Sequence, residues 1–294
     1  MRRMLMALLV GCGLPVSPAA AQFKTDDPDT EILVQGIRER DQEIASFVKA
    51  LTFTPVQGTI SRFEWEVCPA VLGLTPELNA RIANRMRAVA SAANIPLAQA
   101  NCTPNALVLL TRDKPRLLKQ LEREAPGIYP DWSVARMRQA IADPSPVAAW
   151  QLNGLLSADG SPYSYNYAGY AIHRSSRFPT RIVPEARRQL EVSVVVIDKS
   201  ALVGLSPTQL ADYAAMRSFV RTDPAKLADS PAPSILKIID APPDAAVPVT
   251  LTQWDLSFLK GVYASTANAW SASQRSEIQK SMGRDLGPGD ARHE

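Results

Sequence analysis

Histidine is almost absent from this chain, which has only His173 and His293 among its 294 residues. His293 is the last residue but one, so histidine-dependent catalysis would have to use His173. A Ser-His-Asp triad on His173 would lack the G-x-S-x-G elbow that usually carries the serine. A zinc site would have one histidine and two cysteines that we expect to be oxidised. We therefore predict no catalytic residue, no metal ligand and no cofactor.

Long hydrophobic runs are also absent. The apolar run at residues 4–10 is much shorter than the roughly 20 residues that span a bilayer. It follows Arg2 and Arg3, and residues 19–21 are three alanines, which place small side chains at −3 and −1. This is the layout of a secretory signal peptide. It predicts cleavage after Ala21 and a mature chain that begins at Gln22.

A lipoprotein signal is the alternative for this amino-terminal region. Residues 9–12 (Leu-Val-Gly-Cys) have the form of a lipobox, in which Cys12 would carry the lipid. Only eleven residues precede Cys12, which is short for that class, so we favour cleavage after Ala21. We expect a periplasmic or secreted protein with no transmembrane segment.

The chain has little net charge and few cysteines. Its 32 basic and 29 acidic residues give a formal charge of +3, and loss of Arg2 and Arg3 lowers it to +1. A near-neutral chain argues against nucleic acid as a partner. With Cys12 in the signal peptide, two cysteines are left, Cys68 and Cys102. Two thiols in an oxidising compartment usually pair, which predicts a disulfide; two buried free thiols are the alternative.

Periodicity predicts the first half of the fold. A leader with an amino-terminal helix (22–58) precedes a single α+β domain (59–285), and a polar tail (286–294) follows it. Strict alternation at 62–67 predicts a strand with Phe63, Trp65 and Val67 buried. An apolar run at 106–110 predicts a strand that is buried on both faces. Between these two strands, apolar residues recur at helical spacing after Thr75, which we expect to cap a helix. The order strand, helix, strand predicts a βαβ start.

The sequence of the second half of the domain predicts further strands and helices. Residues 147–156 and 190–197 have the pattern of strands, and 158–160 (Ala-Asp-Gly) that of a hairpin turn. The strand returning from that turn would place Tyr163, Tyr165 and Tyr167 on one face. Capping boxes at Ser206 and Thr252 open two helices, and a last helix follows at 271–282. The expected fold is a mixed β-sheet with flanking helices.

The region from 163 to 188 interleaves tyrosines with arginines. Its arginines could hold an anionic ligand, such as an envelope polymer, by bidentate contacts while the aromatic rings stack. A solvated basic loop beside a tyrosine-faced hairpin is the alternative. The binding residues predicted here are Arg174, Arg177, Arg181, Tyr165 and Tyr167.

Short catalytic motifs give no support to an enzyme. Two S-x-x-K tetrads begin at Ser234 and Ser257, but neither comes with the S-D-N and K-T-G partners of penicillin-binding enzymes. The sequence has neither the G-x-x-x-x-G-K-[ST] loop nor the G-x-G-x-x-G loop, the two glycine-rich motifs that bind phosphate groups.

Two C-terminal segments resemble the layout of metzincin zinc proteases. Residues 251–263 are similar to the last helix of matrixin-type domains, and 208–216 to their active-site helix. The resemblance would put Thr208 and Asp212 at ligand positions and Gln209 at the position of the catalytic glutamate. Threonine and one aspartate do not hold zinc, and glutamine is no base. The resemblance implies a zincin-like scaffold without its metal.

The chain also resembles a group of exported alphaproteobacterial proteins that brings no known activity. The shared motifs are Val67-Cys68-Pro69, Cys102-Thr103-Pro104-Asn105 and the run 209–213. We therefore predict a non-enzymatic periplasmic or envelope protein that binds a protein or an envelope polymer. The alternative is a periplasmic hydrolase with an unrecognised site that uses Asp212, His173 or the tyrosines.

Overall fold

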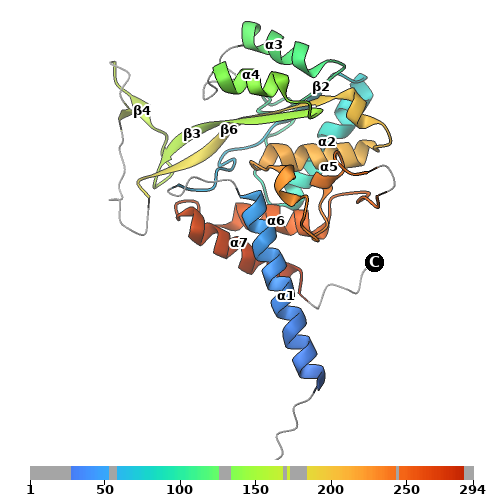
Figure 1. Ribbon diagram of the computed structural model, residues 1–294. Coiled ribbons are helices and arrows are strands. Elements are labelled where there is room, and N and C mark those ends of the chain that lie inside the picture. Colours follow the sequence, from blue (N-terminus) through green and yellow to red (C-terminus); the bar gives the residue numbers. More distant parts are fainter. Residues whose placement is uncertain are drawn as a thin grey trace, which may run out of the picture. The chain divides into compact units, whose positions relative to one another are not determined.

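The computed structural model describes residues 28–52, 58–125, 134–167, 171–172, 184–242 and 245–287. The chain divides into two compact units, Met1–Arg38 and Glu39–Glu294, and the fold below is that of the second. Within the described residues its main sheet has the strand order β1-β2-β6-β3, with β1, β2 and β6 parallel and β3 antiparallel. Helices flank this mixed sheet, which confirms the α+β class (Figure 1).

The main sheet has four strands, and the described residues form seven α-helices. The strands of the main sheet are β1 (Pro69–Leu72), β2 (Ala106–Thr111), β3 (Val147–Ser157) and β6 (Ala186–Asp198). The helices are α1 (Pro28–Leu51), α2 (Pro76–Ala92), α3 (Lys114–Glu124), α4 (Val134–Ala142), α5 (Pro207–Phe219), α6 (Gln253–Ala264) and α7 (Ser271–Asp285).

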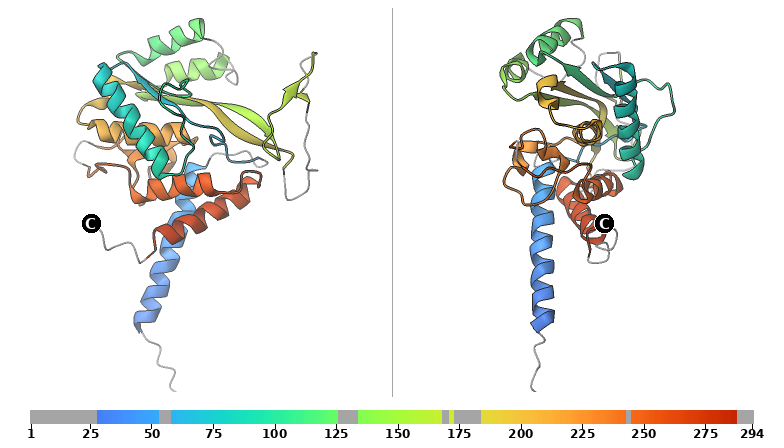
Figure 2. Two further views of the ribbon diagram at one scale, coloured as in Figure 1. Left: turned by 180° about the vertical axis from the view of Figure 1, so that it is seen from behind. Right: turned by 90° about the vertical axis from the view of Figure 1, so that its right-hand side faces the viewer.

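The sheet separates two hydrophobic clusters. Successive side chains of a strand point to opposite faces, so Val194 and Val196 of β6 join a small cluster with α3 and α4. Val195 and Ile197 join the main core, to which α1, α2, α5, α6 and α7 contribute. Figures 1 and 2 show α3 and α4 on one face of the sheet and α2 and α5 on the other.

Helix starts agree with their sequence signals. The Thr75 and Asp113 side chains accept backbone hydrogen bonds at the starts of α2 and α3. The capping boxes of Ser206 and Thr252 are both formed at α5 and α6. The parallel unit β1-α2-β2 confirms the predicted βαβ start.

One predicted strand is wrong. Residues 62–67 form only isolated bridges, and the first strand is β1, which starts two residues later. The Arg62 backbone bridges to β6 and to the residue after α5, whereas Val67 bridges to the chain beyond α2. The segment is therefore divided among separate neighbours instead of following one strand. Phe63 and Val67 are buried as predicted, but Trp65 is 56% exposed.

The strand predicted to return from the 158–160 turn is also wrong. β3 pairs antiparallel with β6 along its length, and a single isolated bridge joins it to the segment after the turn. That segment instead contributes β4 (Ser164–Tyr165), which pairs with β5 (Ala171–Ile172) in a separate sheet. Tyr163, Tyr165 and Tyr167 thus do not share one continuous strand, because β4 covers only Ser164 and Tyr165.

Candidate binding site

The segment between α5 and α6 (residues 220–252, hereafter the α5–α6 segment) curls around a hollow of about 790 Å³. Its described residues contain only short 3₁₀ turns, η3 (Pro224–Leu227) and η4 (Ile235–Lys237), and isolated backbone turns. A connection this long without a regular helix or strand is uncommon in a compact domain and is typically functional. All the described residues that line the hollow come from this one segment.

The composition of the segment explains both its path and its lining. The lining is mostly alanine and proline; the prolines are Pro224, Pro231, Pro233, Pro242 and Pro248. Proline fixes its own φ and donates no backbone hydrogen bond, so it breaks both helices and sheet ladders. Alanine fills little of the enclosed space. The result is an apolar hollow without regular secondary structure.

The buried carboxylate of Asp255 fixes one wall of the hollow. Asp255 is the third residue of α6 and is fully buried. It accepts hydrogen bonds from the Ser234 hydroxyl at 2.6 Å and the Ile235 amide at 2.8 Å, in addition to those of its own capping box with Thr252. Burial raises the pKa of Asp255, and these donated hydrogen bonds lower it only in part. The first turn of α6 thus holds the start of η4.

Two side chains of α5 fix the other wall. The Gln209 amide donates to the Pro248 carbonyl at 2.8 Å. The fully buried Asp212 carboxylate accepts from the Thr250 hydroxyl at 2.8 Å and the Leu251 amide at 2.6 Å. Arg85 of α2 adds a bidentate ion pair to Asp212, at 2.7 and 3.0 Å. The middle and the C-terminal end of the α5–α6 segment are therefore anchored to helices of the core.

Lys237 and Asp240 are the ionisable side chains among the described residues that line the hollow. The Lys237 ammonium donates to the Ser230 carbonyl, and burial lowers its pKa although the Asp255 charge opposes that shift. In the S-x-x-K tetrad that begins at Ser234, the serine hydroxyl already makes structural contacts. It donates to the Asp255 carboxylate and accepts from the Leu236 amide. The second tetrad begins at Ser257, which is buried within α6.

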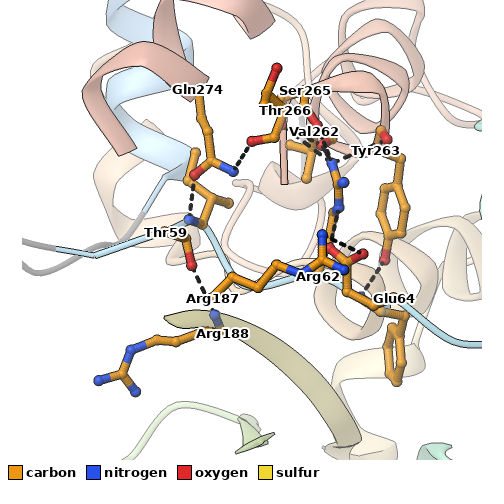
Figure 3. Close-up of polar contacts among 12 residues, drawn as sticks. Thr59, Arg62, Glu64, Arg187, Arg188, Val262, Tyr263, Ser265, Thr266 and Gln274 are labelled. Atoms are coloured by element: carbon orange, nitrogen blue, oxygen red, sulfur yellow. Dashed lines mark hydrogen bonds and ion pairs between the residues drawn. The ribbon is translucent and has the colours of Figure 1, made fainter. Parts of the chain in front are cut away.

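A second polar cluster surrounds Arg62 at the C-terminal end of α6 (Figure 3). The Arg62 guanidinium donates to the carbonyl of Val262 in the last turn of α6 at 2.6 Å and to that of the C-cap residue Ser265 at 2.7 Å. It also pairs with Glu64 at 2.9 Å. The hydroxyl of the partly buried Tyr263 donates to a carbonyl of α5 at 2.7 Å, and desolvation raises the pKa of this side chain. These contacts tie α5 and α6 to the start of the domain.

The arginine–tyrosine surface that the sequence predicts is only partly described. Arg174, Arg177 and Arg181 lie outside the described residues, as does His173. Tyr165 belongs to β4, and Tyr167 is fully exposed. Three of the five predicted binding residues thus lie outside the described part of the chain. The α5–α6 segment, which the sequence marks only by its density of proline and alanine, contains the hollow instead.

Cys68 and Cys102 form a disulfide with a Cα–Cα distance of 6.0 Å. The start of β1 at Pro69 explains why they meet, because Cys68 then precedes β1 and Cys102 precedes β2. Adjacent parallel strands begin at the same edge of a sheet. Asn105 joins the two strand starts, since its side chain accepts from the Cys68 amide at 2.7 Å and donates to the Glu66 carbonyl at 3.0 Å.

The described part of the chain contains no group of three or more histidine, cysteine, aspartate or glutamate side chains that could hold a metal ion. No helix in that part is long and apolar enough to cross a membrane. No protein-family model, curated protein or solved structure matches this chain.

Proposed function

We propose that this chain is an exported, non-enzymatic protein that binds an apolar ligand in the hollow of the α5–α6 segment. The observation that carries the proposal is the hollow itself, which at about 790 Å³ lies within the range of small-molecule sites, about 300–1,000 Å³. Its walls are held by the buried Asp212 and Asp255, so the site exists before a ligand arrives. A preformed site reduces the entropy cost of binding.

The lining indicates what kind of ligand would fit. Proline and alanine offer apolar contact and few donors, which favours a hydrophobic body. The two ionisable side chains among the described lining residues, Lys237 and Asp240, carry opposite charges and offer one polar contact of each sign. An apolar molecule with one polar group that reaches Lys237 or Asp240 satisfies both features.

Export rests on the amino-terminal sequence and is supported by the disulfide. A Cys68–Cys102 bond suits the periplasm or the extracellular space, where disulfides persist. Sequencing of the exported protein should find Gln22 as its first residue. A mature chain that begins with lipidated Cys12 would contradict this cleavage site and make the protein a lipoprotein.

Filling the hollow tests the binding function. N-phenyl-1-naphthylamine, an apolar dye that brightens in dry sites, should bind the wild-type protein saturably. The separate variants Ala225→Phe and Ala246→Phe place a ring in the hollow and should weaken dye binding about tenfold, equivalent to about 1.4 kcal/mol. Ala272→Phe, at an exposed position in the first turn of α7, is the matched control and should leave binding unchanged. Equal affinity in all four proteins would refute the proposal.

A further inference from the structure

Trp65 is exposed where the surrounding pattern would bury it. Phe63 and Val67, two residues away on either side, are 2% and 0% exposed, whereas Trp65 is 56% exposed. A large indole left in water forgoes the stabilisation that its burial would give. Exposed tryptophans on a fixed backbone are typical of recognition surfaces, where tryptophan is the most enriched anchor.

The backbone around Trp65 is held from several directions. The Val67 amide donates to the Pro96 carbonyl at 2.8 Å, and the Ala98 amide donates to the Val67 carbonyl at 3.1 Å. The next residue, Cys68, is in the disulfide. The Asn105 side chain fixes the Glu66 carbonyl. The indole is therefore presented by a constrained segment, which lowers the entropy cost of binding a partner.

Trp65 borders an open hollow of about 610 Å³ next to the disulfide. The charged residues of its lining are both acidic, Glu64 and Glu66. Glu64 is neutralised by Arg62 at 2.9 Å and Arg187 at 3.7 Å. The side chain of Arg87 donates to the Ala98 carbonyl of the lining. The exposed Glu66 carboxylate, in contrast, has no side-chain ion pair or hydrogen bond within the described residues.

We propose that Trp65 and Glu66 bind a cationic side chain, an arginine or lysine of a partner protein. A cation over an indole face is attracted by the ring quadrupole, and a neighbouring carboxylate strengthens the contact. A partner protein is favoured over a small free cation because the hollow is open. Its exposed rim would leave a small ligand half in water, whereas a protruding side chain brings its own surface to cover the indole. This surface shares no lining residue with the hollow of the α5–α6 segment.

Nuclear magnetic resonance of the full disulfide-bonded protein tests the proposal. The probe is the peptide acetyl-Gly-Arg-Gly-Arg-Gly-amide, and its twin replaces each arginine with citrulline, which has the same shape but no charge. The chain has five tryptophans, so Trp65→Phe identifies the indole signal of Trp65. We expect the arginine peptide to shift this signal saturably and the citrulline peptide to leave it in place.

Variants assign the binding to the two residues. Glu66→Gln should weaken binding of the arginine peptide at least fivefold, and Glu77→Gln, an equal loss of charge at an exposed site in α2, should not. Trp65→Ala should abolish the peptide-induced shifts of the Glu66 and Thr103 amides while the rest of the spectrum shows the native fold.

Three results would overturn the proposal. They are equal shifts with the citrulline peptide, shifts with chitobiose but not with arginine (a glycan site), and spermidine binding as tightly as the peptide (a site for free polyamines).

Discussion

Asp212 and Asp255 are both fully buried, yet the two carboxylates are stabilised by different partners. Asp212 has the positive charge of Arg85 beside it as well as two neutral donors. Asp255 has only neutral donors, from Ser234, Ile235 and Thr252. Removing a carboxylate from water disfavours its charged form, and the neutral donors around Asp255 offset this only in part. Its pKa is raised for this reason.

The raised pKa of Asp255 predicts how stability depends on pH. Between the unfolded pKa of about 3.9 and the higher folded value, the folded state binds more protons than the unfolded state. The contribution of Asp255 is therefore fully present below about pH 3.9 and is lost as the pH rises through the folded pKa. Chemical unfolding at a series of pH values from 3 to 8 measures this slope.

Asp255→Asn should remove that part of the slope, while Asp229→Asn, at an exposed position, should leave it. Asp255→Ala should lower the free energy of unfolding by roughly 2–4 kcal/mol, because it leaves buried donors without an acceptor and removes a helix cap. An unchanged pH slope in Asp255→Asn would show that another group titrates in this range.

At the scale of elements, local signals predicted more than long-range pairing did. The caps at Thr75, Asp113, Ser206 and Thr252 each depend on residues within one helical turn, so the sequence is enough to locate them. The boundary between 62–67 and β1 depends on which distant strand each residue meets. Alternation cannot specify that, and it predicted a buried Trp65 where the structure exposes it.

The disulfide is the covalent link between two of these elements. It joins the residues that precede β1 and β2, which are 34 positions apart. Closing a loop of that size should stabilise the protein by about 3–4 kcal/mol on the chain-entropy account. We expect the double variant Cys68→Ala/Cys102→Ala to unfold at a correspondingly lower denaturant concentration, as measured by circular dichroism. A loss below about 1 kcal/mol would mean that the unfolded chain is already restricted in this region.

At the scale of the whole molecule, the candidate site depends on long-range contacts that no local sequence motif predicts. Ser234 meets Asp255, and Gln209 meets Pro248, across tens of residues. The sequence shows the helix caps and the dense prolines separately. It does not show that the same carboxylate caps α6 and holds the wall of a hollow. The sequence search was directed to known catalytic motifs and to the arginine–tyrosine stretch, and the hollow has neither.

The contacts of Asp212 also bear on the resemblance to zinc proteases. That resemblance places Asp212 at a ligand position, but both carboxylate oxygens already accept hydrogen bonds, from Arg85, Thr250 and Leu251. A zinc ion would have to displace the Arg85 guanidinium and find two further ligands, since a catalytic site needs three. We therefore predict that Asp212 stabilises the fold and holds no metal.

Protein purified without chelator should contain well under one zinc per chain by elemental analysis and should cleave no peptide substrate. Asp212→Ala should lower the free energy of unfolding by roughly 2–3 kcal/mol, because the Leu251 amide and the Thr250 hydroxyl lose their acceptor. Arg85→Met is the matched variant; because the Arg85 side chain is 38% exposed, it should cost less than the loss of the carboxylate. Stoichiometric zinc that disappears in Asp212→Ala together with a peptidase activity would favour the hydrolase alternative, because only a ligand role for Asp212 would link the two losses.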